Sequence, residues 1–458
     1  MAHIEAPLRE LAAPGPALRS LSDPTVSIRV SEIVGSSALG GRAGELAGRS
    51  VLLATGGQLT AALALLELDG SARRLVIMPP DIEARHYDTV VAMADVDAVV
   101  VDDRSRHRPA LDLAVRASGT PVAAVRDGSA RHLRTEWILM TSGTTGVPKL
   151  VLHDRASLTA ALHVRSPADG AAAWGTFYDI RRYGGLQIFL RAMLGGASMV
   201  LSDADEATAD HLARLARHGV SHLSGTPSQW RRALMHPELR QIPLRYVRLS
   251  GEIADQAILD TLRDAFPRAA IGHAYASSEA GVGFDVNDGL AGFPVDYAAS
   301  VRGGVAMRIV DDTLRIRSAG AASRYLGGEK SFVDAEGFVD TGDMIERRGD
   351  RYYFAGRQGG IINIGGLKVH PEEIEAVINR HPHVRMSRVR RKPSPITGSI
   401  VVADVVLSDD APAPRQVELR DDILKLCRET LPRHKVPAAI SFVPALAVGA
   451  TGKLARSG

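Results

Sequence analysis

The residues best suited to chemistry form a loop of hydroxyl and glycine residues between an apolar strand and a lysine. The strand is expected at Trp137–Met140, and Pro148 and Lys149 close the loop. Glycines let the backbone turn tightly and point its N–H groups at one spot, hydroxyls add donors, and a lysine adds a mobile positive charge. Such a loop can bind a polyphosphate. Its residues are Thr141, Ser142, Gly143, Thr144, Thr145 and Gly146.

This loop differs from the Walker A phosphate loop. In the Walker A pattern a glycine directly precedes the lysine, and a helix follows. Here Val147 and Pro148 separate Gly146 from Lys149, and no helix start is evident. An ordinary polar hairpin is the alternative interpretation, but an unbroken run of Ser, Thr and Gly after a buried strand favours phosphate binding.

The nine residues TSGTTGVPK resemble the signature of the ANL adenylating superfamily, which contains acyl- and aryl-CoA synthetases, peptide-synthetase adenylation domains and firefly luciferase. Four further segments resemble other motifs of that superfamily, in the same order. Together the segments extend over residues 137–456. The four are AYASSEAG (274–281), FVDTGD (338–343), GRQGGIINIGGLKVHPEEIE (356–375) and the final ATGKLARSG.

The resemblance implies a role for each matching residue in binding ATP. Tyr275 would lie beside adenine, Ser278 would donate to the α-phosphate, and Asp343 and Arg357 would bind the ribose and phosphate. Glu279 would bind Mg²⁺, and Thr141 is a second candidate ligand. One protein carboxylate is enough, because most ligands of Mg²⁺ at such a site are phosphate and water oxygens. The remaining residues expected around the nucleotide and the acid are Ser250, Gly251, Glu252, Ala274, Ala276 and Ser277.

The same resemblance makes Lys453 the catalytic lysine, with Glu279 and Lys149 as the other catalytic candidates. Attack of a carboxylate on the α-phosphate builds negative charge that a positioned ammonium offsets. The small C-terminal domain would then rotate, withdraw Lys453 and admit a thiol. The residues that match the family's thiol tunnel are Gly365, Gly366 and Lys368, and those that match its hinge are Gln358 and Gly359.

Several positions depart from the family pattern, and two of them bear on whether the chain is catalytic. Leu150 stands after the loop lysine where the family usually has glycine, and Gly359 occupies the hinge position where Asp or Lys is usual. Glycine adopts both hinge conformations readily, so rotation should survive. These departures motivate one alternative, a degenerate nucleotide binder without catalysis.

The expected acyl pocket lacks the histidine found in many CoA synthetases. The chain reads TFYDIRRYGGLQ over 176–187, and its candidates are Tyr178, Asp179, Arg181, Tyr183 and Gly184. In one interpretation Asp179 or an arginine binds a polar group of the acid, since a buried charge needs a partner. In the other, Asp179 caps the following helix and pairs with Arg181 or Arg182.

A basic cluster near the C-terminus also has two interpretations. The cluster comprises Arg388, Arg390, Arg391 and Lys392. Arginines suit phosphate, so the cluster could meet the 3′-phosphate of CoA. The alternative, which we favour, is a solvated strand edge whose charges resist edge pairing.

The elements that must position these residues alternate between strand and helix. Apolar strands are expected over 50–55 and 73–80, a helix over 58–70, a helix and strand over 88–103, and a further apolar run over 120–128. Alternation of this kind predicts a parallel sheet with helices on its faces, which binds ligands beyond the carboxyl ends of its strands. A helix is also expected over 206–218.

The chain then changes character. Residues 305–357 predict a small antiparallel region, and the residues after it predict a compact α+β unit with helices over 370–381 and 415–431. The fold class is therefore α/β: a large N-terminal domain with parallel and mixed sheets, flanking helices and a small β region, followed by a small, mobile α+β domain. The domains are expected at 1–357 and 358–458.

Composition narrows the class of protein. A length of 458 residues requires more than one domain, and a net charge of +3 gives no reason to expect a nucleic-acid partner. The single cysteine, Cys427, excludes an internal disulfide, and neither a signal segment nor a membrane-spanning run is evident. We therefore expect a cytoplasmic enzyme.

The leading hypothesis is an AMP-forming acyl- or aryl-CoA ligase that uses ATP, Mg²⁺ and coenzyme A on a small carboxylic acid. The nearest alternative is a stand-alone adenylation enzyme that loads an aryl or amino acid onto the pantetheine of a carrier protein. A homodimer is an assembly to test.

Overall fold

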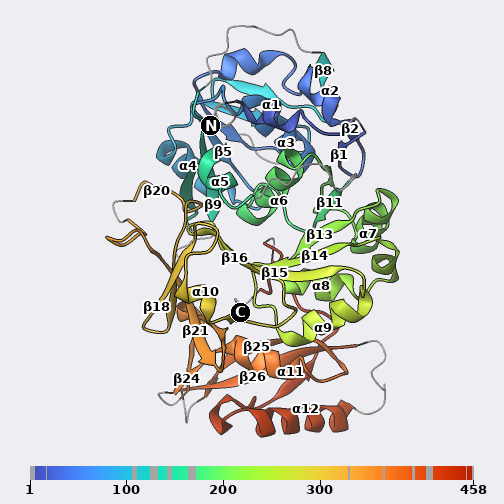
Figure 1. Ribbon diagram of the computed structural model, residues 1–458, viewed down its shortest axis with the longest axis vertical. Helices are drawn as coiled ribbons and strands as arrows, with labels where there is room; N and C mark the ends of the chain where they lie inside the picture. The colour runs from blue at the N-terminus through green and yellow to red at the C-terminus, as the bar shows by residue number, and fades with distance from the viewer. Residues whose placement is uncertain are drawn as a thin grey trace.

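The strands that alternate with helices after Ser50 form a seven-stranded sheet in the computed structural model of the chain (Figure 1). The pairs β6–β4, β4–β5 and β5–β9 are parallel, which confirms the prediction. The order is β20-β10-β9-β5-β4-β6-β7, with β4 Ser50–Leu53, β5 Arg74–Ile77, β6 Ala98–Val101, β7 Ala114–Arg116, β9 Glu136–Thr141, β10 Lys149–Asp154 and β20 Arg324–Leu326.

The structure describes residues 6–16, 18–105, 111–123, 133–141, 147–162, 172–328, 331–364, 367–394, 398–408, 416–449 and 451–455. The apolar run of residues 120–128 is described only as far as Ala123. Its described part forms β8 (Val122–Ala123), which pairs with β3 (Ser36–Ser37), while β7 supplies the sheet edge. Both residues of β8 are exposed.

A second, eight-stranded sheet lies against the first through a shared apolar core. Its central strands are parallel and both of its outer pairs are antiparallel. The order is β16-β15-β14-β13-β11-β12-β1-β2, with β1 Ser20–Ser22, β2 Ser27–Arg29, β11 Ala173–Thr176, β12 Ser198–Val200, β13 His222–Gly225, β14 Tyr246–Ser250, β15 Ala270–Ser277 and β16 Gly281–Val286.

Helices α3 (Gln58–Leu68) and α6 (Tyr183–Leu194) supply much of that shared core. Ten of the eleven residues of α3 are buried, because the helix has apolar or small residues on every side rather than on one stripe. The other longer helices pack on the outer faces: α4 Tyr87–Met93, α7 Thr208–Arg217, α8 Pro227–Ala233 and α9 Gln256–Ala265. The position of α7 confirms the helix predicted over 206–218.

The predicted antiparallel region forms a five-stranded sheet in the order β17-β22-β21-β19-β18 (yellow and orange in Figure 1). Its strands are β17 Phe293–Pro294, β18 Ala306–Val310, β19 Thr313–Arg317, β21 Val339–Arg348 and β22 Arg351–Arg357. The shortest helices of the N-terminal domain are α1 Leu8–Ala12, α2 Val30–Val34, α5 Arg155–Thr159 and α10 Asp296–Ala299.

The C-terminal residues form a smaller α+β unit with a separate apolar core (orange and red in Figure 1). Its elements are β23 Ile362–Ile364, β24 Leu367–Val369, α11 Pro371–Ile378, β25 Val384–Ser394, β26 Gly398–Leu407, α12 Gln416–Thr430 and β27 Ile440–Phe442. The predicted fold class of a large N-terminal and a small C-terminal domain is confirmed. Among the described residues, no helix is long and apolar enough to cross a membrane.

Candidate active site

The phosphate-binding loop predicted from the sequence connects two antiparallel strands. Thr141 ends β9 and lies opposite Lys149, which begins β10. A strand therefore follows the lysine, unlike the helix of the Walker A motif. Leu150 is fully buried within β10, which accounts for an apolar residue at a position where the family usually has glycine. The predicted loop residues Ser142, Gly143, Thr144, Thr145 and Gly146 lie outside the described residues.

Lys149 is linked to Glu279 through a tyrosine that sequence reasoning missed. Strand β20 pairs with β10 and places Tyr325 beside the loop lysine. The Lys149 Nζ atom lies 5.2 Å from the centroid of the Tyr325 ring, and the Tyr325 hydroxyl donates to Glu279 Oε1 at 2.9 Å. Burial, followed by the charge of Glu279, raises the pKa of Tyr325. No motif in the sequence marks this residue.

The turn that carries Ser278 and Glu279 rests on a buried histidine. Ala274, Ala276 and Ser277 belong to β15, and the turn follows directly. His153 of β10 lies under the turn, with Nε2 at 2.8 Å from the Ser278 carbonyl oxygen and Nδ1 at 3.0 Å from the Ser157 hydroxyl. A carbonyl can only accept, so Nε2 carries the proton. Burial lowers the pKa of His153 and keeps the ring neutral.

The three residues predicted to bind adenine and ribose lie in mutual contact. The Tyr275 hydroxyl donates to Asp343 Oδ2 at 2.5 Å, and Arg357 Nε donates to Asp343 Oδ1 at 3.0 Å. Strand pairing of β21 with β22 fixes Asp343 opposite Arg357. The Tyr275 ring stacks on Phe284 and Phe354, with centroid separations of 5.7 and 5.3 Å.

Lys453 belongs to a tight turn of the C-terminal domain that reaches these residues. Val448 and Leu454 form a β-bridge that closes the turn. The Lys453 side chain keeps access to solvent, but the protein that surrounds it lowers the pKa of its ammonium group. Repulsion from Arg357 lowers the pKa further, whereas the carboxylates Glu252, Asp343 and Glu279 act in the opposite direction.

The turn after β14 contacts both the lysine turn and the expected acyl segment. Glu252 accepts from the backbone N–H groups of Ser228 at 2.9 Å and Leu454 at 2.8 Å. Gly251 adopts a positive φ of 88°, and a Cβ there would lie 3.4 Å from Lys453 Cε. The Tyr178 hydroxyl donates to the Ser250 carbonyl at 2.8 Å, so the acyl segment lies against this turn.

The charged residues of the acyl segment bind one another. Arg181 is only 2% exposed and donates to both oxygens of Asp179, at 2.9 and 2.6 Å. Arg181 also donates to the backbone carbonyls of Thr55 and Gly56. This arrangement favours the structural interpretation of the pair. Helix capping by Asp179 was a wrong prediction, because α6 has Arg182 at its N-cap and no side-chain cap bond.

The two tyrosines of this segment lie in different places: Tyr183 is buried beside His153, whereas the half-buried Tyr178 lies against the turn after β14. Burial raises the pKa of both Tyr178 and Tyr183. The centroids of the Tyr183 and His153 rings are 5.6 Å apart, and a Cβ at Gly184 on α6 would lie 3.8 Å from the Tyr178 ring, an ordinary contact distance.

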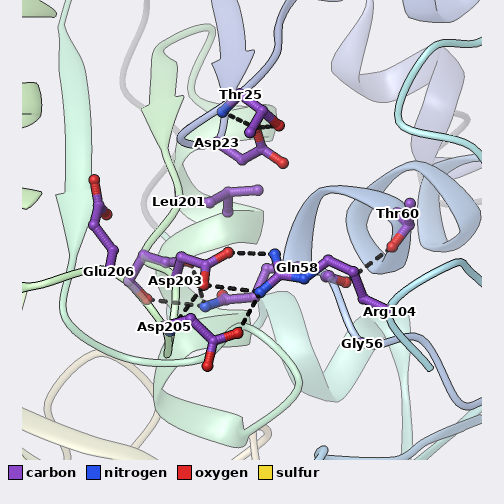
Figure 2. Close-up of polar contacts among 12 residues, drawn as sticks. Asp23, Thr25, Gly56, Gln58, Thr60, Arg104, Leu201, Asp203, Asp205 and Glu206 are labelled. Atoms are coloured by element: carbon purple, nitrogen blue, oxygen red, sulfur yellow. Dashed lines mark hydrogen bonds and ion pairs between the residues drawn. The ribbon is translucent and has the colours of Figure 1, made fainter. Parts of the chain in front are cut away.

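A cavity of about 380 Å³ lies on the other side of the acyl segment. Asp179, Arg181 and Arg182 line one wall, and Val448, Gly449 and Gly452 of the lysine turn line another. Figure 2 shows part of the rim, where Arg104 reaches the carboxylates of Asp203 and Asp205, each at 2.9 Å. These ion pairs hold the loop after β6 against the loop after β12.

The predicted hinge residues directly follow Arg357, and the predicted tunnel residues belong to the described part of the chain only at Lys368. Gln358 and Gly359 form a single exposed 3-10 turn, Gln358–Gly360. Lys368 is exposed on β24, while Gly365 and Gly366 lie outside the described residues.

The basic cluster on β25 is partly neutralised. Arg388 and Arg390 both donate to Asp404 on β26, each at 2.9 Å. Arg388 also donates to the carbonyl of Ala455, next to the lysine turn. Arg391 and Lys392 are exposed. The two arginines therefore have a structural partner within the sheet.

More than half of the chain, residues 69–326, matches a family described as AMP-binding enzyme. The chain belongs to this family. Residues 373–453 match the C-terminal domain of AMP-binding enzymes. Membership of the ANL adenylating superfamily, expected from the motifs, is thereby confirmed.

Curated relatives of this AMP-binding enzyme carry ligase names. A 2-succinylbenzoate–CoA ligase of Bacillus velezensis is 24% identical over 413 residues, which cover 86% of this chain and 78% of the relative. The human mitochondrial acyl-coenzyme A synthetase ACSM2A is 25% identical over 348 residues, which cover 70% of this chain and 60% of the relative.

Solved structures share the fold of this AMP-binding enzyme along nearly its whole length. The anthranilate CoA ligase AuaEII, in complex with anthranoyl-AMP, superposes with a TM-score of 0.81 at 19% identity, over 98% of this chain and 95% of that one. A benzoate CoA ligase from Burkholderia xenovorans LB400 gives 0.80 at 20% identity, over 98% and 97%. At these identities the likeness establishes the fold.

Proposed function

We propose that this AMP-binding enzyme activates a carboxylic acid with ATP as an acyl-adenylate and then transfers the acyl group to the thiol of coenzyme A. The chain is an AMP-forming acid–thiol ligase, the class to which its named relatives belong. The observation that carries the proposal is the position of Lys453. The residues on either side of it, Gly452 and Leu454, bond to Thr226 and Glu252 of the N-terminal domain, so this lysine of the C-terminal domain lies against the turn after β14.

The first half-reaction is an in-line displacement at the α-phosphorus. A carboxylate oxygen of the acid forms the new P–O bond, and pyrophosphate leaves with the electrons of the broken one. The ammonium of Lys453 offsets the charge that builds on the phosphoryl oxygens, and Lys149 with the loop after β9 binds the departing phosphates. Ser278 donates to the α-phosphate, and Asp343 with Arg357 binds the ribose.

The residues beside the phosphates fit a magnesium ion. Glu279 offers one carboxylate, which the Tyr325 hydroxyl orients. The described residues contain no group of three or more His, Cys, Asp or Glu side chains arranged around a metal. Mg²⁺ needs few protein ligands when phosphate oxygens are present, so Glu279, with Thr141 as a second candidate, would hold it and reduce the charge of the phosphates.

In the second half-reaction the thiolate sulfur attacks the acyl carbon, a thioester forms and AMP leaves. Lys453 must withdraw first, which the proposed domain division at 357/358 and the Gln358–Gly359 hinge would permit. Gly365, Gly366 and Lys368 are the proposed tunnel residues. The alternative acceptor is the pantetheine of a carrier protein.

The acid is proposed to be an aryl or acyl acid without an ammonium group, rather than an amino acid. Asp179 is the residue that would bind a substrate ammonium, but Arg181 already occupies both of its carboxylate oxygens. The relatives named for benzoate, anthranilate and 2-succinylbenzoate motivate aromatic acids as the first compounds to test.

Acid-dependent ATP–pyrophosphate exchange across aromatic, aliphatic and amino acids tests the first half-reaction. Exchange with none of the panel would overturn the adenylation proposal. With the best acid, AMP release is then compared with free CoA and with a pantetheinylated carrier protein. Stimulation by the carrier and not by CoA would replace the ligase by the carrier-loading alternative.

A further inference from the structure

The lysine turn is received by a small set of side chains on the N-terminal domain. We call residues 448–449 and 451–455 the lysine loop. Two backbone groups of this loop bond to the N-terminal domain: the Leu454 N–H donates to Glu252 Oε1 at 2.8 Å, and the Gly452 carbonyl accepts from the Thr226 hydroxyl at 2.5 Å. The bonds lie on either side of Lys453, so together they fix its backbone.

Glu252 connects the lysine loop to helix α8. Its second oxygen accepts from the Ser228 N–H at 2.9 Å, in the first turn of α8. A carboxylate at a helix N-terminus is favourable because it faces unpaired N–H groups and the positive end of the helix dipole. That anchor holds the carboxylate in place, and its other oxygen remains available for Leu454.

Thr226 and Gln229 form the other half of the contact. Thr226 is fully buried, caps α8 by accepting from the Gln229 N–H at 3.1 Å, and donates its hydroxyl proton to Gly452. The Gln229 side chain donates to the Phe177 carbonyl at 2.9 Å and packs against Gly452. Gly452 has a φ of 75°, and a Cβ there would lie 2.3 Å from Gln229 Nε2. A side chain at position 452 would therefore collide with Gln229 in this arrangement of the two domains.

We propose that Thr226, Gln229 and Glu252 are a receptor for the lysine loop, and that these positioning residues serve adenylation alone. This inference rests on the proposed function. Each receptor bond to the loop depends on the present arrangement of the two domains, so withdrawal of Lys453 breaks every one of them. Loss of Glu252 should slow the step that needs Lys453 and leave the step that follows its withdrawal unchanged.

The decisive experiment separates the two half-reactions in Glu252→Ala and Glu252→Gln. Acid-dependent pyrophosphate exchange should fall about tenfold to a hundredfold in Glu252→Ala, since a charge-assisted hydrogen bond is lost. Glu252→Gln keeps an acceptor oxygen and should fall less. Thioester formation from chemically prepared acyl-adenylate should match the wild type in both. The control is Glu45→Gln, an exposed glutamate that pairs with Arg42.

The pH profile of pyrophosphate exchange distinguishes the proposed role of Glu252 from a purely structural one, because a purely structural role would leave the profile unchanged. The charge of Glu252 raises the pKa of Lys453 against burial and Arg357, as do Asp343 and Glu279. In Glu252→Gln the alkaline limb of pyrophosphate exchange should therefore shift to lower pH, because the ammonium loses its proton earlier. An unshifted limb, or an equal loss in both half-reactions, would overturn the proposal.

Trypsin measures docking of the loop without any activity. The peptide bond after Lys453 is the one whose N–H group Glu252 holds. Cleavage there, followed by intact mass spectrometry, should be several-fold faster in Glu252→Ala than in wild type or Glu45→Gln. Equal cleavage rates would overturn the receptor. If wild type shows no exchange while cleavage still responds to Glu252, the proposed function fails and the receptor stands.

Discussion

Lys453 is a cation in surroundings that disfavour its charge, and it has the most direct chemical role of the candidate residues. Replacement by alanine should lower acid-dependent pyrophosphate exchange by about a hundredfold or more, the scale at which one stabilising group acts on a developing oxyanion. Thioester formation from added acyl-adenylate should persist. An exposed lysine of α12, Lys425→Ala, is the matched control. Unchanged exchange in Lys453→Ala would contradict the assigned role.

His153 makes a pH-dependent contribution to stability. Burial lowers its pKa below the ordinary 6.5, so the unfolded chain binds a proton at a pH where the folded chain does not. The contribution is complete above pH 6.5 and is lost as the pH falls toward the lowered pKa. In His153→Gln, the fall in unfolding free energy between pH 8 and pH 5 should be smaller than in wild type.

Urea titrations at the two pH values measure this difference, with the half-exposed His86→Gln as control. An identical pH dependence in wild type and His153→Gln would contradict it. A glutamine amide can still donate to the Ser278 carbonyl, so the substitution removes the titration while keeping a donor under the turn of Glu279.

The segment between β11 and α6 depends on an ion pair that has little access to water. Arg181 binds Asp179 and two backbone carbonyls of the loop after β4, and so joins elements of the two large sheets. Removal of one partner of a buried pair leaves the other charge uncompensated, at a cost of about 3 kcal/mol or more. Arg181→Ala should lower the unfolding free energy by that amount in urea denaturation.

Arg232→Ala, an exposed arginine on the rim of the same cavity, is the control for Arg181. Retained stability together with a raised KM for the acid would instead assign Asp179 and Arg181 to the substrate. The acid pocket would then lie on the charged side of this segment.

At the scale of the whole molecule, Asp255 is a second carboxylate, besides Glu252, that joins the two domains. Both carboxylate oxygens of Asp255, on the N-terminal domain, accept from Arg231 Nη2 at 2.7 Å. Asp255 Oδ2 also accepts from the side-chain amide of Asn379, on the C-terminal domain, at 3.1 Å. Arg231 also donates to the Arg385 carbonyl on β25. This network favours the domain orientation in which Lys453 meets the active site.

Asn379→Ala should therefore lower pyrophosphate exchange by about fivefold, the equivalent of one hydrogen bond of about 1 kcal/mol. Thioester formation from acyl-adenylate should not slow. The exposed Asn363→Ala on β23 is the control in the same domain. A fall in both half-reactions would mean that Asn379 supports the fold of the small domain rather than its orientation.

The sequence by itself determined the family, the two-domain α/β class and the positions of Lys149, Glu279 and Lys453. The family and the site residues follow from short segments whose residue types are suited to binding phosphate and ribose. The fold class follows from strand and helix periodicities, which are local properties of the chain.

Only the tertiary structure decided what those residues touch. Tyr325 reaches Glu279 and His153 reaches Ser278 because strands distant in sequence pair or pack together. Asp179 had two interpretations in the sequence, and the fold of the neighbouring loop gave it Arg181 as a partner. The receptor contact between Thr226 and Gly452 spans 226 positions of the chain. Local pattern carries no information on such a contact, because it exists only when both domains have folded and docked.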